Sequence, residues 1–165
     1  MVSNLESICD LLCFDSEDTF YFLQIIKRKK EHPDLKSNSM VIKTYYIKSA
    51  EHLMAVFPEI ACLCRFHNAR GCINLNRRSF EKVAYQMLMK VSGQLMAKDF
   101  SSVKQAYDSV CGTSCSDPAK KWIVDIDTTS TSVIDAVKET IRCLQPSPGT
   151  CKLIATLPTK NGVHL

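Results

Sequence analysis

Residues 122–127 read Trp-Ile-Val-Asp-Ile-Asp, an aromatic and β-branched run that ends in two acids. This composition predicts a β-strand over residues 121–127. Successive side chains of a strand point to opposite faces, so we expect Asp125 and Asp127 to share one face and Trp122, Val124 and Ile126 to share the other. Two neighbouring carboxylates repel each other unless a cation lies between them, and their oxygen atoms suit Mg²⁺ or Mn²⁺. The stretch therefore predicts a divalent-metal site with Asp125 and Asp127 as ligands.

The two acids also have a simpler interpretation, as a strand end whose carboxylates face water and cap the turn at residues 128–130. An Asp-x-Asp spacing is short and common, so it does not separate the alternatives by itself. The following residues predict a helix over 131–144 and a strand over 151–157, which is a β-α-β order. The Asn161-Gly162 pair then predicts a tight turn and a further strand from Val163.

The second feature is the segment Thr-Lys-Asn-Gly-Val-His at residues 159–164. The chain between the two features is long enough for one helix and one returning strand, so we expect them on adjacent strands. The Thr159 hydroxyl, the Lys160 ammonium and the His164 imidazole are then expected beside the carboxylates. Such groups, with turn amides near Gly162, are phosphate ligands. The alternative is an ordinary hairpin turn followed by a structural histidine.

Taken together, residues 123–127 and 159–164 resemble the first two motifs of the archaeo-eukaryotic primase superfamily, which includes the primase-polymerases. The resemblance covers about the last quarter of the chain. It implies an α/β (α+β) fold with an RRM-like palm and an N-terminal α/β extension. It implies that Asp125 and Asp127 bind metal and, with His164, are catalytic. The nucleotide-binding residues that it implies are Thr159, Lys160, Asn161, Gly162 and His164.

The function expected from this resemblance is metal-dependent nucleotidyl transfer in DNA replication or repair, which makes or extends primers. The implied partners are nucleoside triphosphates, a single-stranded DNA template and replication proteins. The third motif of the family, a carboxylate on a later strand, is expected beyond residue 165. We therefore expect a chain that is inactive alone, as the N-terminal part of a longer catalytic domain. Two alternatives stay open: a non-catalytic nucleic-acid or nucleotide-binding module, and a metal-dependent nuclease.

The length of 165 residues fits one domain. We expect residues 1–115 to form an N-terminal α/β unit and residues 116–165 to begin the palm. Ser49 and Ser79 are the expected N-caps of two helices. The N-terminal elements that the sequence predicts are a helix over 3–14, strands over 19–27, 40–47 and 72–75, and helices from 49, over 79–98 and over 101–110. The apolar residues of the 79–98 helix that recur at helical spacing, and are expected in the core, are Val83, Met87, Leu88, Val91 and Leu95.

The net charge of +4 comes from a basic middle region that begins at residues 27–30. Such a balance favours polyanionic partners, although mild basicity is weak support for nucleic-acid binding. The candidates for contact with a nucleic-acid backbone are Arg70, Arg77 and Arg78, chosen for their charge. There is no Gly-x-Ser-x-Gly motif and no Walker loop, which argues against esterase and P-loop ATPase functions.

No apolar run reaches the length of a membrane span, and the first residues lack the order of a secretory signal. We therefore expect a cytoplasmic protein whose nine cysteines stay reduced. A zinc site is the alternative interpretation of Cys62, Cys64, His67 and Cys72, which lie within one short stretch, and of Cys111 and Cys115, which flank another, but their spacings match no common zinc finger.

Overall fold

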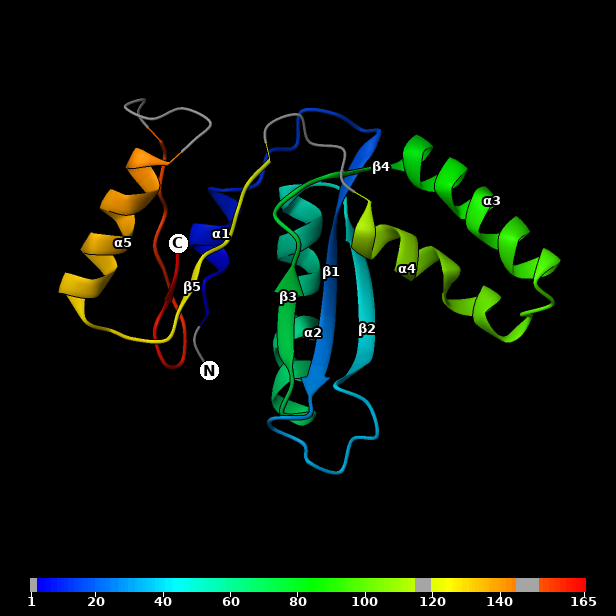
Figure 1. Ribbon diagram of the computed structural model, residues 1–165, viewed down its shortest axis with the longest axis horizontal. Coiled ribbons are helices and arrows are strands. Elements are labelled where there is room, and N and C mark those ends of the chain that lie inside the picture. The colour runs from blue at the N-terminus through cyan, green and yellow to red at the C-terminus, as the bar shows by residue number, and fades with distance from the viewer. Residues whose placement is uncertain (1–2, 115–119, 145–151) are drawn as a thin grey trace. The chain divides into compact units, whose positions relative to one another are not determined.

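The computed structural model describes three stretches of the chain, residues 3–114, 120–144 and 152–165 (Figure 1). The chain forms two compact units. The central unit is Cys13–Lys120, and the terminal unit combines Met1–Leu12 with Lys121–Leu165. Both units mix helices with antiparallel strands, so the fold is α+β.

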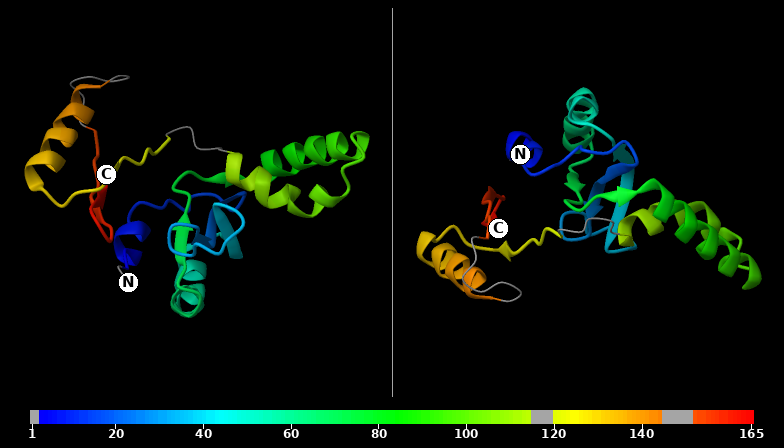
Figure 2. Two further views of the ribbon diagram at one scale, coloured as in Figure 1. Left: turned by 60° about the horizontal axis from the view of Figure 1, so that its bottom comes forward. Right: turned by 90° about the horizontal axis from the view of Figure 1, so that it is seen from above.

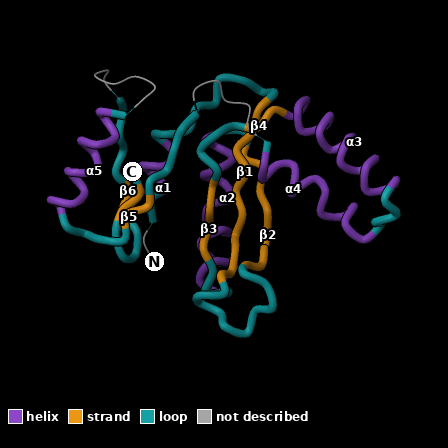
Figure 3. The backbone as a smooth tube through the Cα atoms, in the orientation of Figure 1, coloured by secondary structure: helices purple, strands orange, loops and turns teal. Residues whose placement is uncertain are grey.

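An antiparallel sheet forms the middle of the central unit, as Figure 3 shows. Its strands are β1 (Thr19–Arg28), β2 (Ser39–Ile47), β3 (Arg70–Ile73) and the short β4 (Arg78–Ser79). The order is β2-β1-β3, and β4 pairs with the first residues of β1. The aromatic and β-branched composition of β1 suits this central place, because both of its faces are covered.

One face of the sheet packs against α2 (Ala50–Phe66). Alternate residues of β1, namely Tyr21, Leu23 and Ile25, are buried on this face. Strand β3 approaches the helix closely at Gly71, where an added Cβ would lie 3.3 Å from Cγ2 of Ile60. The α2 residues buried here are Leu53, Ile60 and Cys64.

The other face packs against α3 (Phe80–Met96) and α4 (Ala106–Thr113), which are joined through the 3₁₀ helix η1 (Ser101–Gln105). Figure 2 shows α3 and α4 side by side as an antiparallel pair. The core on this face is formed by Phe20, Phe22, Val83, Val110 and Cys111.

The two expected N-caps are confirmed. The Ser49 hydroxyl accepts a hydrogen bond from the His52 amide at 3.0 Å, and the Ser79 hydroxyl accepts one from the Lys82 amide at 3.3 Å. Each bond satisfies one of the amides that a helix leaves unpaired in its first turn. Helix α2 continues past Pro58 to Phe66, so this proline does not end it.

Of the five apolar positions of the 79–98 helix expected in the core, only Val83 is buried, and Met87 and Val91 are half-buried. The prediction is wrong for the other two. Val83 is fully buried, but Leu88 is 67% exposed and Leu95 is 49% exposed. The cause is geometric, because only the first turns of α3 lie over the sheet and the rest of the helix contacts α4 and η1.

The terminal unit contains α1 (Leu5–Cys9), β5 (Asp125–Ile126), α5 (Thr131–Cys143), β6 (Leu157–Pro158) and β7 (Val163–His164). Its antiparallel sheet has the order β5-β7-β6. Asn4 ties the N-terminal residues to this unit, since its side-chain amide donates to the Pro158 carbonyl at 2.9 Å. The buried apolar residues are Ile126, Ile134 and Leu157.

Both expected strands of this unit are shorter than the sequence predicts. The strand expected over 121–127 is regular only at Asp125–Ile126, and Trp122 is 80% exposed. The strand expected over 151–157 begins at Leu157, and residue 151 lies outside the described residues. Among the helices that the structure describes, none has the length and hydropathy that a membrane span requires.

Candidate metal and nucleotide site

The two sequence features of the terminal unit lie on paired strands, as expected. Asp125 of β5 is directly opposite His164 of β7 in an antiparallel register. The Asp125 Oδ1 and His164 Nε2 atoms are 3.3 Å apart, with side chains that are 65% and 44% exposed. A carboxylate and an imidazole therefore meet at an accessible point on the sheet.

Asp127 follows one residue beyond the regular part of β5. Between the two acids, Ile126 is only 8% exposed, whereas Asp125 and Asp127 are both exposed. This alternation is what a strand requires when its apolar side chain faces the core and its acids face outward. Two carboxylates with oxygen ligands for a hard divalent cation are thus available, although no cluster of three His, Cys, Asp or Glu residues suited to a metal occurs among the described residues.

The turn between β6 and β7 is closed by its own hydrogen bonds. The Thr159 amide donates to the Gly162 carbonyl at 2.8 Å, and the Gly162 amide donates to the Thr159 hydroxyl at 3.0 Å. The Thr159 side chain therefore shapes the turn. The side chains of Lys160 and Asn161 are exposed at its tip, and neither forms a hydrogen bond or an ion pair with the residues that the structure describes.

Gly162 has a steric role that the sequence alone does not reveal. A Cβ atom at this position would lie 1.9 Å from the Ile126 carbonyl oxygen and 2.7 Å from the Thr128 amide nitrogen. Only glycine permits so close an approach of the turn to β5. The turn that carries Thr159 and Lys160 is therefore held against the strand that carries Asp125.

The three arginines chosen as nucleic-acid contacts lie in the central unit, in different environments. Arg70 is 44% exposed and its guanidinium binds the carboxylate of Glu31. Arg77 is mostly buried and is paired with Asp15. A hydrogen bond from the Cys13 thiol, followed by the Arg77 guanidinium, lowers the pKa of Asp15.

The guanidinium of Arg78 is part of the core of the central unit. This residue is 5% exposed. Its Nε donates to the Cys111 carbonyl at 2.6 Å and its Nη1 to the Asn76 carbonyl at 2.7 Å. Arg78 joins the start of α3 to the end of α4, and this burial does not fit the expected contact with nucleic acid.

Where the structure describes them, the cysteine and histidine residues considered as a zinc site form no group of three that could hold a metal. Cys64 is buried in α2, whereas Cys62 and Cys72 are exposed. Burial raises the pKa of the Cys64 thiol, which disfavours the thiolate that a metal needs. Cys115 lies outside the described residues.

Sequence reasoning missed a polar network between the sheet and α4. The Asp108 carboxylate accepts hydrogen bonds from the Tyr46 hydroxyl at 2.5 Å and from the Thr44 hydroxyl at 2.9 Å, and Gln24 donates to Thr44 at 3.3 Å. The signal in the sequence was the alternation of Thr44 and Tyr46 on one face of a strand.

No protein-family model, curated protein or solved structure matches the chain.

Proposed function

We propose that the terminal unit carries the metal and nucleotide ligands of a primase-polymerase type nucleotidyltransferase, which makes or extends primers on a single-stranded template in DNA replication or repair. The observation that carries the proposal is the pairing of β5 with β7, in which Asp125 lies opposite His164. The close approach of Gly162 to β5 adds the turn that bears Thr159 and Lys160.

Asp125 and Asp127 are the ligands proposed for Mg²⁺ or Mn²⁺. When bound, the ion supplies positive charge that stabilises an α-phosphate under attack by a 3′-hydroxyl group, with release of pyrophosphate. The nucleotide-binding residues in this proposal are Thr159, Lys160, Asn161, Gly162 and His164. Imidazole, ammonium and turn amides are groups that bind triphosphate oxygens.

The fold that we propose for the terminal unit is the beginning of an RRM-like palm. Its support is a small antiparallel sheet, β5-β7-β6, accompanied by the amphipathic helix α5. The compartment proposed is the cytoplasm, on the basis of the nine cysteines and because the seven that are described are free thiols.

Two measurements test the function. Mn²⁺ binding, followed by the loss of the free-ion paramagnetic resonance signal, is expected to disappear in the Asp125→Ala/Asp127→Ala variant and to persist in Asp135→Ala, an exposed acid on α5 of the same unit. Incorporation of labelled nucleotides on a primed single strand by the full-length protein is expected to follow the same pattern. Undiminished incorporation by the double variant would contradict the assignment of Asp125 and Asp127 as metal ligands of a nucleotidyltransferase.

A second candidate is a nucleic-acid-binding module without catalysis. It is favoured by the absence of a third acidic ligand around Asp125 and Asp127 in the part of the chain that the structure describes. A module of this kind binds single strands with a strong salt dependence and is indifferent to Mg²⁺ and to both aspartates. Binding that requires neither ion nor aspartate, together with no incorporation, would decide for the module.

A further inference from the structure

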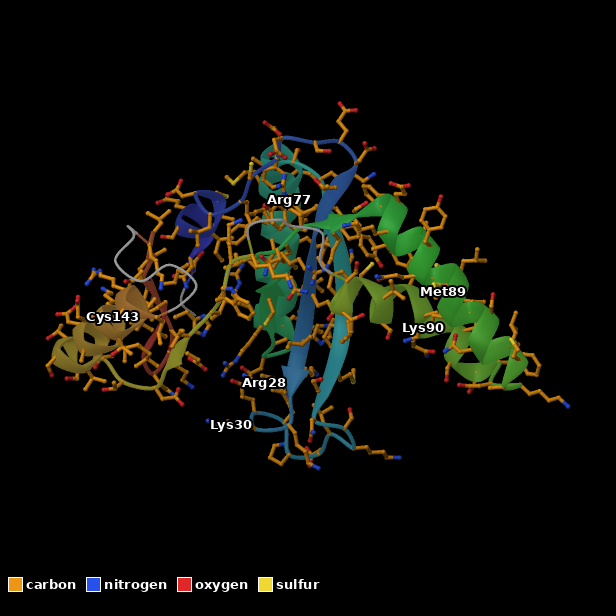
Figure 4. The ribbon with its side chains drawn as sticks, turned by 45° about the horizontal axis from the view of Figure 1, so that its top comes forward. Arg28, Lys30, Arg77, Met89, Lys90 and Cys143 are labelled. Atoms are coloured by element: carbon orange, nitrogen blue, oxygen red, sulfur yellow. The ribbon has the colours of Figure 1, made fainter. Side chains whose placement is uncertain are left out.

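One end of the central unit carries a cluster of cations that the proposed catalytic site does not use. The end of β1 and the loop that leads to β2 present four exposed cations, Arg28, Lys29, Lys30 and Lys36. Figure 4 shows Arg28 and Lys30 at this end of the sheet. None of the four forms an ion pair with a described residue. Of the two loop carboxylates, that of Glu31 is bound by Arg70.

The C-terminal end of α2 lies beside this loop. The His32 ring nitrogen Nε2 is 2.8 Å from the carbonyl oxygen of Asn68, which follows α2. Arg70, at the start of β3, holds Glu31 of the loop. These contacts bring Arg65 and Phe66, the last two residues of α2, to the same end as the lysines. We call this surface, made of Arg28, Lys29, Lys30, Lys36, Arg65 and Phe66, the basic hairpin end.

The aromatic ring in this surface is unusually accessible. Phe66 is 81% exposed, and the His67 ring stands at an 88° angle to it with centroids 4.8 Å apart. A phenylalanine ring that is exposed to water does not contribute the stabilisation that a buried ring gives. A flat apolar ring at the same end of the unit as several cations suits a ligand that has both bases, which stack, and phosphates, which bind cations. Acidic peptides offer the charge but seldom the stacking surface.

Backbone hydrogen bonds also connect residues within this loop. The Lys29 amide donates to the Asn38 carbonyl at 2.9 Å, and the Leu35 amide donates to the His32 carbonyl at 3.1 Å. A loop that is already ordered loses less conformational entropy when it binds, so its cations are more effective ligands than those of a flexible tail.

We infer that the basic hairpin end binds single-stranded nucleic acid, with the lysines and arginines on phosphates and Phe66 stacked on a base. This surface lies in the other unit from Asp125 and Asp127, and the inference does not depend on the proposed catalysis. The Asp125→Ala/Asp127→Ala variant is therefore expected to bind single strands as well as the unchanged protein does, which keeps the two proposals separable.

The test is fluorescence anisotropy of a labelled oligothymidine against salt concentration. Lys29→Ala/Lys30→Ala is expected to weaken binding roughly tenfold near 0.1 M salt and to reduce the slope of log K against log salt by about 1.4, because each phosphate contact on a single strand contributes about 0.7. The matched control is Lys82→Ala/Lys104→Ala, which removes the same charge from exposed positions on α3 and η1. Equal affinities in the two double variants would overturn the inference.

The stacking role has its own comparison. Phe66→Ala is expected to weaken oligothymidine binding about five- to hundredfold, the range of a lost base–aromatic stack. Phe100→Ala, which removes a ring that is 66% exposed elsewhere in the unit, should leave binding unchanged. The melting temperatures of both variants establish that they are folded. Equal losses in the two variants, or tighter and equally lysine-dependent binding to phosphatidylserine vesicles, would contradict the assignment.

Discussion

Asp125 and His164 occupy directly opposed positions on β5 and β7, with the carboxylate Oδ1 3.3 Å from the imidazole Nε2. The contact depends on two strands of two residues each. One more residue pair supports it, because Val124 and Leu165 exchange backbone hydrogen bonds at 2.9 Å in both directions. A side-chain change at His164 therefore tests the chemistry of the site, whereas a change in the neighbouring turn tests its architecture.

Replacing His164 by alanine is expected to weaken the binding of a non-hydrolysable nucleoside triphosphate with Mg²⁺ about 10- to 100-fold. A hydrogen bond to a charged group contributes about 1.5–3 kcal/mol, which corresponds to such a factor. Isothermal titration calorimetry measures the change, with His52→Ala in the central unit as the control. An unchanged Kd for His164→Ala would remove this residue from the nucleotide site.

Replacing Gly162 by alanine is expected to destabilise the terminal unit by roughly 1–3 kcal/mol, because the new Cβ must displace backbone atoms that lie within 3 Å of its position. Gly93→Ala in α3 is the matched control, since nothing lies within 4 Å of its added Cβ. The Gly93→Ala change should raise the free energy of unfolding by about 0.5–1 kcal/mol, because glycine in a helix is less favourable than alanine. Hydrogen exchange of the Val124 and Leu165 amides, which pair across the sheet of the terminal unit, measures the first outcome, and chemical denaturation followed by helical circular dichroism measures the second. A neutral Gly162→Ala would mean that the turn does not press on β5.

The helices and longer strands of the central unit were predictable because each has a local cause. Ser49 and Ser79 predict the starts of two helices, and the aromatic residues of β1 predict a strand. What the sequence could not show is where a helix leaves the core. Leu88 has the spacing of a buried residue, yet α3 has passed the edge of the sheet before that position.

The strand adjacency at the candidate site was also predictable, because the turn at Asn161-Gly162 and the run before Asp127 both have strong local signals. The contribution of the N-terminal residues to the same unit was not, since the bond from Asn4 to Pro158 spans almost the whole chain. Only part of the basic hairpin end could be predicted from the sequence. Arg28, Lys29 and Lys30 are consecutive in sequence. Phe66 is far from them in sequence, and the contact of His32 with Asn68 holds the end of α2 beside their loop.

Replacing Asp108 by asparagine is expected to destabilise the central unit by about 1.5–3 kcal/mol. The carboxylate accepts from the Tyr46 and Thr44 hydroxyls at once, and bonds to a charged acceptor are the stronger kind. Urea unfolding measures the loss. The Asp34→Asn variant, which changes an exposed loop acid, is the control and should stay within about 0.5 kcal/mol of the unchanged protein.

The stability of the central unit is expected to fall above pH 9. Burial, and then the charge of Asp108, raises the pKa of Cys111 from 9.0 to about 11. A pKa raised in the folded state means that the stabilisation is complete below pH 9 and is lost as the pH rises towards 11. The pKa of Tyr46 is raised as well, mainly by burial, which extends the decline above pH 10.

Removing the thiol tests this origin of the alkaline decline. Cys111→Ala should cost stability at neutral pH, because the residue is fully buried, and the difference from the unchanged protein should shrink between pH 9 and 11. Cys143→Ala, at an exposed position, should leave the whole profile unchanged. Urea midpoints across this pH range provide the measurement, and parallel profiles for the unchanged protein and Cys111→Ala would contradict the assignment to Cys111.

The departure of α3 from the core gives the last prediction. Val83→Ala should destabilise the central unit by roughly 2 kcal/mol, because Val83 is fully buried against Phe20 and Phe22. Leu88→Ala, only five positions later in the same helix, should cost less than about 0.5 kcal/mol, since that side chain is 67% exposed. Alanine has a higher helix propensity than either residue, and the gain is larger for the β-branched Val83 than for Leu88, so intrinsic helix propensity opposes the expected difference and cannot be its cause. Equal and large losses in urea unfolding would mean that the later turns of α3 are covered after all.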